Sequence, residues 1–276
     1  MFSKALMNAT YKNGRPGQLT AEHEKAEHHR FKSEFLFKNP AIPKNVYVSR
    51  LIQHFLIIKA LETRLQQLPE TAQADEISAF FALSYLEQLW RTPGIAEDLR
   101  QLGVSPDEIK EGEIAKTTNA YLQTIQTLSS KALLAHFLLH VAGFMHGGNI
   151  IQKKYIDPSN ELTAYKIPAN QYDFSGIYPF LPEGRLSALN VYQDMMKQID
   201  NIELNEDEFA ELLEQCKSVY DIMSGIYDDL CDLHTQQLKS AVYSPAGVAA
   251  GIVVIALILK ILVDFLPVTP GFSPSR

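Results

Sequence analysis

The sequence predicts an all-α fold: a multi-helical bundle followed by one C-terminal transmembrane helix. Apolar residues recur at steps of three and four along most of the 276-residue chain, and no long strand-like alternation or internal repeat interrupts them. Hydrophobic residues make up 46% of the composition, which is enough to bury a core. The apolar run at 246–267 differs from the other segments because it lacks a polar face, which is typical of a membrane anchor.

The chain should begin with an irregular lead-in at residues 1–19, followed by one helical domain at 20–241. The first helix is expected to begin at Thr20, a good N-cap, and acidic residues in its first turn suit the positive end of a helix. Pro40 should end this helix, because the residue before a proline is pushed out of the α region.

The same periodicity places further helices in the domain, at 45–67, 74–90, 94–103, 106–129, 131–155, 186–202 and 206–241. Asn205 and Glu208 form a capping-box variant at the start of the last of these. The proline-containing stretch at 156–190 is expected to be an ordered but irregular loop region. Together these segments predict an irregular helical bundle.

The apolar run at 246–267 has only two charged residues, both near its far end. Because a helix of about 20 residues crosses the hydrocarbon core, we expect a single-pass anchor here and a short polar tail at 268–276. Gly247 and Gly251 form a GxxxG motif through which two anchors could pair in a homodimer. The N-terminus lacks an apolar run long enough for a signal peptide, so the helical domain is expected on the cytoplasmic side of the membrane.

Charge and cysteine content exclude two classes of protein. The net charge of −7 and the pI near 5.6 argue against a nucleic-acid partner, since backbone binding needs clustered Lys and Arg. Cys216 and Cys231 lie 15 residues apart in one expected helix, too far for a disulfide. We therefore expect two reduced thiols in the core.

One candidate for chemistry is the segment HEKAEH at 23–28. His23 lies in the first turn of its expected helix, and Glu27 follows one turn later on the same face. A carboxylate there can accept the hydrogen bond of one ring nitrogen, which fixes the tautomer and raises the basicity of the other. An imidazole oriented in this way can bind heme iron.

A second candidate is the apolar helix around 134–149, which contains Gly143, Gly147 and Gly148. Glycine inside a helix costs about 0.8–1.0 kcal/mol relative to alanine, so something must offset three of them. Close helix packing is one explanation. The other is a flat ligand lying directly on the backbone, which opposite a histidine would make a slot for a porphyrin.

Several short segments resemble the heme oxygenase family, and they occur in the family's order over most of Thr20–Leu230. HEKAEH resembles its proximal helix, and the glycine-broken segment after Ala135-His136 resembles its distal helix. The other matching segments are 31–36, 91–93, 97–99, 172–177 and 201–204.

The resemblance implies His23 as the axial ligand of heme iron, Glu27 as its hydrogen-bond partner, and Gly143, Gly147 and Gly148 as the distal wall. It also implies a reaction in which heme is both cofactor and substrate. O2 and electrons from an external reductase would convert heme to biliverdin, carbon monoxide and ferrous iron.

Three departures from the family pattern stand out. Phe144 replaces the distal aspartate that orders water, and His140 stands at the place of an arginine in the distal pocket. The basic residues that normally hold the heme propionates are partly absent: Lys197 could serve if a one-residue gap is allowed, whereas Thr20 stands where a lysine is common. His140 and His146 could restore a polar distal network.

Phe144 also favours an alternative, a heme-binding sensor, buffer or carrier without oxygenase activity. A third hypothesis is a non-heme metal oxidase, since His136 and His140 share a helix face. A purely structural, tail-anchored interaction module is the last alternative. The site of ring opening, the identity of the reductase, the membrane and the oligomeric state do not follow from the sequence.

Overall fold

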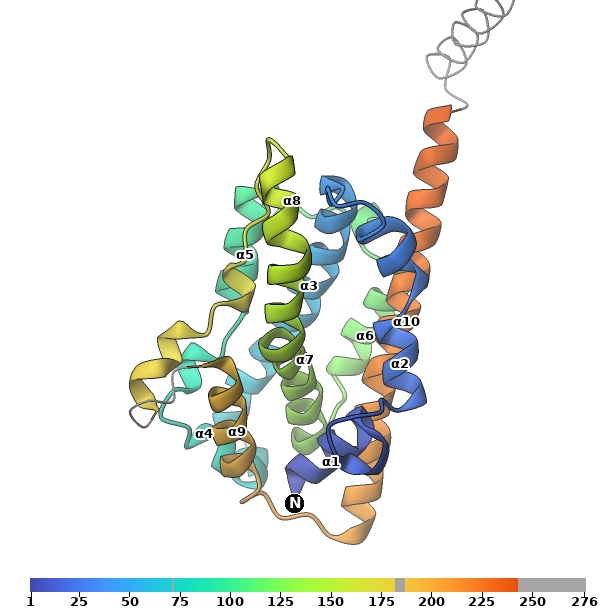
Figure 1. The fold of residues 1–276 in the computed structure, drawn as a ribbon. Coiled ribbons are helices and arrows are strands. Elements are labelled where there is room, and N and C mark those ends of the chain that lie inside the picture. The colour runs from blue at the N-terminus through green and yellow to red at the C-terminus, as the bar shows by residue number, and fades with distance from the viewer. Residues whose placement is uncertain (71, 182–186, 243–276) are drawn as a thin grey trace, which may run out of the picture. The chain divides into compact units, whose positions relative to one another are not determined.

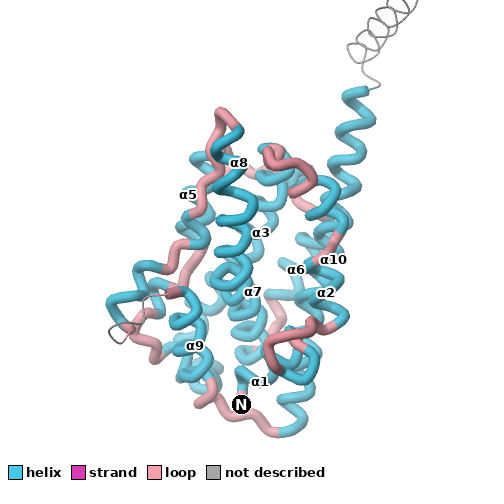
Figure 2. Tube along the Cα trace, viewed as in Figure 1, coloured by secondary structure: helices cyan, strands magenta, loops and turns pink. Residues whose placement is uncertain are grey.

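The computed structural model describes residues 1–70, 72–181 and 187–242. The chain divides into two compact units, Met1–Cys231 and Asp232–Arg276. Figure 2 draws the described part almost entirely as helices joined by loops, and no strand occurs there beyond an isolated bridge between Tyr11 and Leu19. The all-α prediction is therefore confirmed for this part of the chain.

Two long helices form the centre of the first unit. Helix α3 (Lys44–Gln67) packs against α7 (Ser130–Ile151), and the two lie side by side in Figure 1. Every residue from 132 to 141 is buried, which explains why the first half of α7 has no polar face in the sequence. Helices α5 (Thr92–Gln101) and α6 (Lys116–Ile125) cover α3 on other sides.

Shorter elements surround this centre. The remaining α-helices are α1 (Phe2–Thr10), α2 (Ala21–Glu27), α4 (Ser78–Phe81), α8 (Asp157–Leu162), α9 (Ala188–Ile199) and α10 (Glu206–Val242). Two π-helical turns, η2 (Phe31–Leu36) and η7 (Gln152–Ile156), follow α2 and α7. Short 3-10 turns lie at Lys12–Gly14, Leu68–Glu70, Ala72–Ile77, Leu86–Gln88, Glu111–Glu113, Asn170–Tyr172 (η8) and Ser175–Phe180. Helix α9 packs against both α1 and α7.

The longest predicted helices are confirmed with small shifts of their ends. Thr20 caps α2, and Asn205 and Glu208 form the predicted reciprocal cap at the start of α10. Cys216 and Cys231 are both buried, as expected.

The irregular lead-in at 1–19 was wrong, because its first half is α1. Phe2, Ala5, Leu6 and Ala9 are spaced as one helical stripe, and all four are buried. The predicted helix from Thr20 to Pro40 is also wrong in extent: α2 ends at Glu27, and the ring of His29 accepts the amide N–H of Phe31, which replaces a helical bond.

Two further helices were predicted too long. The stretch 74–90 contains residues of two 3-10 turns, Ala72–Ile77 and Leu86–Gln88, with only the four-residue helix α4 between them. Its buried residues Ile77, Phe80 and Leu83 recur every three positions, a spacing that α and 3-10 turns share. In 106–129 the α-helix is limited to α6, because the side chain of buried Gln53 bonds the backbone of Glu113 and Ala115 just before it. The loop region at 156–190 contains the short helix α8.

The predicted anchor at 246–267, with Gly247 and Gly251, and the polar tail at 268–276 lie outside the described residues. Within the residues that are described, no helix is both long and apolar enough to cross a membrane.

Candidate functional site

His23 is placed by a junction between the end of α1 and the start of α2. The Thr20 side chain caps α2 by accepting the amide N–H of His23 at 3.4 Å, and it donates to the carbonyl of Ala9 at 2.6 Å. The amide of Thr20 also donates to the carbonyl of Thr10, at 3.2 Å. The N-terminal helix therefore fixes the first turn of α2.

The His23 ring is held on one edge and on one face. Its Nδ1 lies 3.1 Å from the carbonyl oxygen of Thr10, and the ring stacks on Tyr220 of α10 with centroids 4.5 Å apart. The Tyr220 hydroxyl in turn bonds the Thr10 hydroxyl at 2.8 Å. Because a carbonyl only accepts, Nδ1 carries the proton, and the lone pair of the neutral ring lies on Nε2.

Burial lowers the pKa of His23, although the Thr10 carbonyl and the nearby Glu27 carboxylate act in the opposite direction. The ring is therefore neutral at pH 7. Its side chain is only half-buried, and Nε2 has no hydrogen-bond partner among the described residues. A neutral imidazole with its distal nitrogen available is the form that binds a metal.

The structure corrects the role predicted for Glu27. Its side chain is exposed and forms an ion pair with Lys32, whose Nζ lies 3.2 Å from Oε2. The hydrogen bond to the His23 ring comes from the Thr10 backbone instead. Glu27 acts on His23 only through its charge, since it raises the pKa of the ring.

Two of the three glycines of α7 present a bare face. A Cβ added at Gly143 or Gly147 would meet no atom within 4 Å, and these residues lie one turn apart on the same side of the helix. Gly143 is exposed and Gly147 is partly exposed. This side of α7 therefore has backbone open to a ligand.

Gly148 has a different role from the one predicted. A Cβ at this position would lie 2.3 Å from Cδ1 of Tyr172, a residue of η8. The missing side chain lets the Tyr172 ring pack against α7. Gly148 therefore serves helix packing and is not part of the open face.

The two predicted distal residues, His140 and Phe144, are both buried. The Phe144 ring lies 5.8 Å from the ring of His54 on α3 and 6.1 Å from that of Tyr172. His54, which the sequence analysis missed, lies 6.4 Å from His140 between ring centroids. Its signal was present: a histidine within the apolar stripe of 45–67.

Lys197 is exposed on α9 and forms no ion pair within the described part of the chain. His146 is also exposed, and its ring meets Tyr192 edge to face at 4.5 Å. His146 lies on α7 itself, and α9, which carries Lys197, packs on α7. A contact of Lys197 with a ligand stays a prediction.

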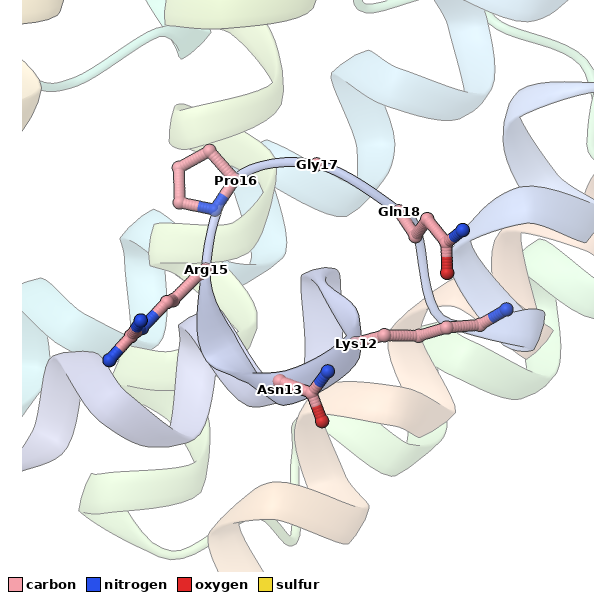
Figure 3. A pocket seen from close by; sticks show the side chains of 6 residues that line it. All are labelled: Lys12, Asn13, Arg15, Pro16, Gly17 and Gln18. Carbon is pink, nitrogen blue, oxygen red and sulfur yellow. The ribbon is translucent and has the colours of Figure 1, made fainter.

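An open hollow of about 460 Å³ lies at the loop that joins α1 to α2. It is lined by Lys12, Asn13, Arg15, Pro16, Gly17 and Gln18, and Figure 3 shows the two cationic side chains extending away from each other. No buried side chain lines the hollow. It therefore lacks the convergent polar groups of a binding site.

The described residues contain no group of three or more His, Cys, Asp and Glu side chains that could hold a metal ion. His136, one of the two histidines of the metal-oxidase hypothesis, bonds the Tyr121 hydroxyl through Nδ1 at 2.8 Å. The geometry of these residues does not support a non-heme metal centre.

The model of the heme oxygenase family matches residues 18–228, which is most of the chain. The chain belongs to the heme oxygenase family. No curated protein sequence matches it.

Solved structures give the same fold. A heme oxygenase-2 from Synechocystis in complex with heme and NO has a TM-score of 0.65 and 19% identity, with 84% of this chain and 86% of that chain covered. A heme oxygenase from Leptospira interrogans has a TM-score of 0.60 and 22% identity, with 82% and 98% covered. The Synechocystis heme oxygenase-1 in complex with heme has a TM-score of 0.63 and 17% identity, with 93% and 99% covered.

Proposed function

We propose that this chain is a heme oxygenase that binds heme between His23 and the glycine face of α7 and cleaves it to biliverdin, carbon monoxide and ferrous iron. The observation that carries this proposal is the state of His23: a neutral ring whose Nδ1 is held by the Thr10 carbonyl and whose Nε2 has no partner among the described residues. Membership of the family and the heme-bound neighbours support it.

The residues fit heme in two respects. Gly143 and Gly147 leave backbone uncovered on one side of α7, where a flat macrocycle can lie. The imidazole of His23 is a suitable axial ligand through Nε2. Heme, as the substrate, supplies the iron at which O2 is activated with electrons from an external reductase.

The chain's own groups would bind and orient the substrate. The Thr10 carbonyl and the Tyr220 ring keep the imidazole in one tautomer and one orientation. The two glycines set the depth to which a ligand can approach α7. Lys197 would hold a propionate from α9.

Heme titration tests the binding step. In the full chain, His23→Ala should abolish the absorbance spectrum of histidine-ligated ferric heme, whereas His28→Ala, on an exposed neighbour, should leave it unchanged. Release of biliverdin and iron on adding reductant and O2 tests turnover. The proposal fails if wild type releases neither, or if His23→Ala keeps the ligated spectrum.

A second candidate function is heme binding without cleavage. Its specific observation is that Phe144 is buried against His54, so no carboxylate is present at the distal position. Products from wild type and Phe144→Asp should be compared under the same conditions. Absence of biliverdin from both, with a normal ligated spectrum, favours the binding role.

We further propose that residues 246–267 anchor the helical domain to a membrane, with the domain in the cytoplasm. The apolar composition of the run supports this. Partition of the full chain into the membrane fraction, and its release on deletion of 246–276, would test the proposal. An association with a reductase at that membrane and pairing of anchors through Gly247 and Gly251 belong to the same proposal.

A further inference from the structure

Arg50 of α3 is a buried cation that has no acidic partner in the described part of the chain. Its side chain is 5% exposed, lies near Tyr47 and Tyr227, and interacts with the Tyr172 hydroxyl as a hydrogen-bond donor. Burial lowers its pKa, but the neighbouring tyrosines outweigh this effect, so the pKa stays above its ordinary value and the guanidinium stays charged. Its Nη1 has no hydrogen-bond partner, and no Asp or Glu in the described part of the chain forms an ion pair with it.

Two buried histidines extend this cluster. His54 lies one turn after Arg50 on α3, and neither of its ring nitrogens has a hydrogen-bond partner within residues 1–70, 72–181 and 187–242. His140 faces His54 from α7, with ring centroids 6.4 Å apart, and its Nε2 also has no hydrogen-bond partner in those ranges. The charged and titratable groups that act on His54 are Arg50, His140 and Lys32, all of them basic.

Two other buried charges among the described residues, Arg91 and Asp98, have hydrogen-bond partners, in contrast to Nη1 of Arg50. Arg91 is also buried, but its guanidinium donates to the carbonyls of Gln88, Leu89 and Asp173. The buried carboxylate of Asp98 likewise accepts hydrogen bonds from the backbone and side chains of 170–171. A buried donor without an acceptor costs about 1–3 kcal/mol, and more when it is charged.

We propose that Arg50, His54 and His140 form a binding site for a small monovalent inorganic anion of halide size. Arg50 supplies the charge, and each histidine, when neutral, can donate one N–H. An anion would satisfy donors that the surrounding side chains leave unpaired. Phe144 packs next to His54, so an aspartate at position 144 would place a negative charge beside that ring. A bound anion would supply this negative charge in its place.

The anion site can be tested on the heme-free full chain. A negative result would then count against the anion site alone, because the proposed oxygenase activity is not measured. Thermal unfolding should be followed while sodium bromide replaces sodium gluconate at constant ionic strength. The melting temperature of the wild type should rise with bromide and saturate, because a ligand that binds only the native state stabilises it. Arg50→Met should weaken bromide binding at least ten-fold, whereas Arg100→Met, at an exposed arginine, should not.

Two further measurements make the test decisive. Phe144→Asp should also abolish the bromide effect, since its carboxylate would occupy the cluster, and His23→Ala should retain it. In wild-type crystals soaked in bromide, an anomalous peak is expected within hydrogen-bond distance of Nη1 of Arg50, and this holds even if Arg50→Met does not fold. The proposal is overturned if no peak is found there, or if Arg50→Met responds to bromide as the wild type does.

Discussion

The bare glycine face of α7 predicts that a change can stabilise the heme-free protein and weaken ligand binding together. In the double variant Gly143→Ala with Gly147→Ala, neither new methyl group would meet an atom within 4 Å. Both positions are inside a helix, where alanine is more favourable than glycine by about 0.8–1.0 kcal/mol per residue. The free energy of unfolding should therefore rise by about 2 kcal/mol, and the melting temperature by about 4–8 °C for a domain of this size.

Heme binding should change in the opposite direction. The two methyl groups would lie on the side of α7 where backbone is uncovered, and they would keep a flat ligand off the helix. We expect heme affinity to fall at least ten-fold. The assays are thermal unfolding of the heme-free chain and absorbance titration with heme.

Gly148→Ala is the matched control on the same helix. Its Cβ would lie 2.3 Å from the Tyr172 ring, so this variant should lose about 1–3 kcal/mol by overpacking. The reasoning is refuted if the double variant unfolds at or below the wild-type temperature. It is also refuted if the double variant binds heme as tightly as the wild type, since the ligand would then lie elsewhere.

Three buried histidines should make the protein sensitive to acid. They are His54, His136 and His140, and burial lowers each pKa, to about 4 for the second and about 3 for the third. Below pH 6.5 the unfolded chain binds more protons than the folded one. The free energy of unfolding should therefore fall by up to about 1.4 kcal/mol per histidine and pH unit. Equal urea midpoints at pH 7.0 and 5.5 would contradict this. Tyr220→Phe removes the hydroxyl bonded to Thr10 but keeps the ring that stacks on His23. We therefore expect the free energy of unfolding to fall by about 1 kcal/mol and the heme spectrum to stay unchanged. A shifted spectrum would show that the hydroxyl orients the imidazole. Asp98→Ala should cost about 3 kcal/mol or more in chemical unfolding, because buried amides would lose their acceptor, and a loss below about 1 kcal/mol would contradict that accounting.

Long helices could be predicted from the sequence, whereas short elements could not. Helices α3 and α10 extend over many turns, so apolar residues at steps of three and four recur often enough in them to predict a helix. In 74–90 the apolar residues recur every three positions, a spacing that a short α-helix and a 3-10 turn share. The stripe of α1 was visible in the sequence, but the glycines and proline that follow it favoured an irregular segment.

For the candidate site, it was easier to predict which residues take part than which groups they contact. The sequence located His23 and the glycines of α7, but it assigned the hydrogen bond of the His23 ring to Glu27. The true acceptor is a backbone carbonyl at Thr10, and a backbone group carries no signature in residue types. The division between Gly143 and Gly147 on one side and Gly148 on the other depends on Tyr172, which is remote in sequence.

The surroundings of Phe144 change how the loss of the distal aspartate is interpreted. Taken alone, it removes a carboxylate from the distal side of the proposed heme site. In the fold, Phe144 packs against His54, and His54 belongs to a cluster in which Arg50 already carries an unpaired positive charge. Restoring an aspartate there therefore changes two things at once, the distal group and the charge balance of the buried cluster. The double variant with Arg50→Met separates the two. The effect of Phe144→Asp on turnover can be assigned to the distal group only if it is the same with and without Arg50→Met.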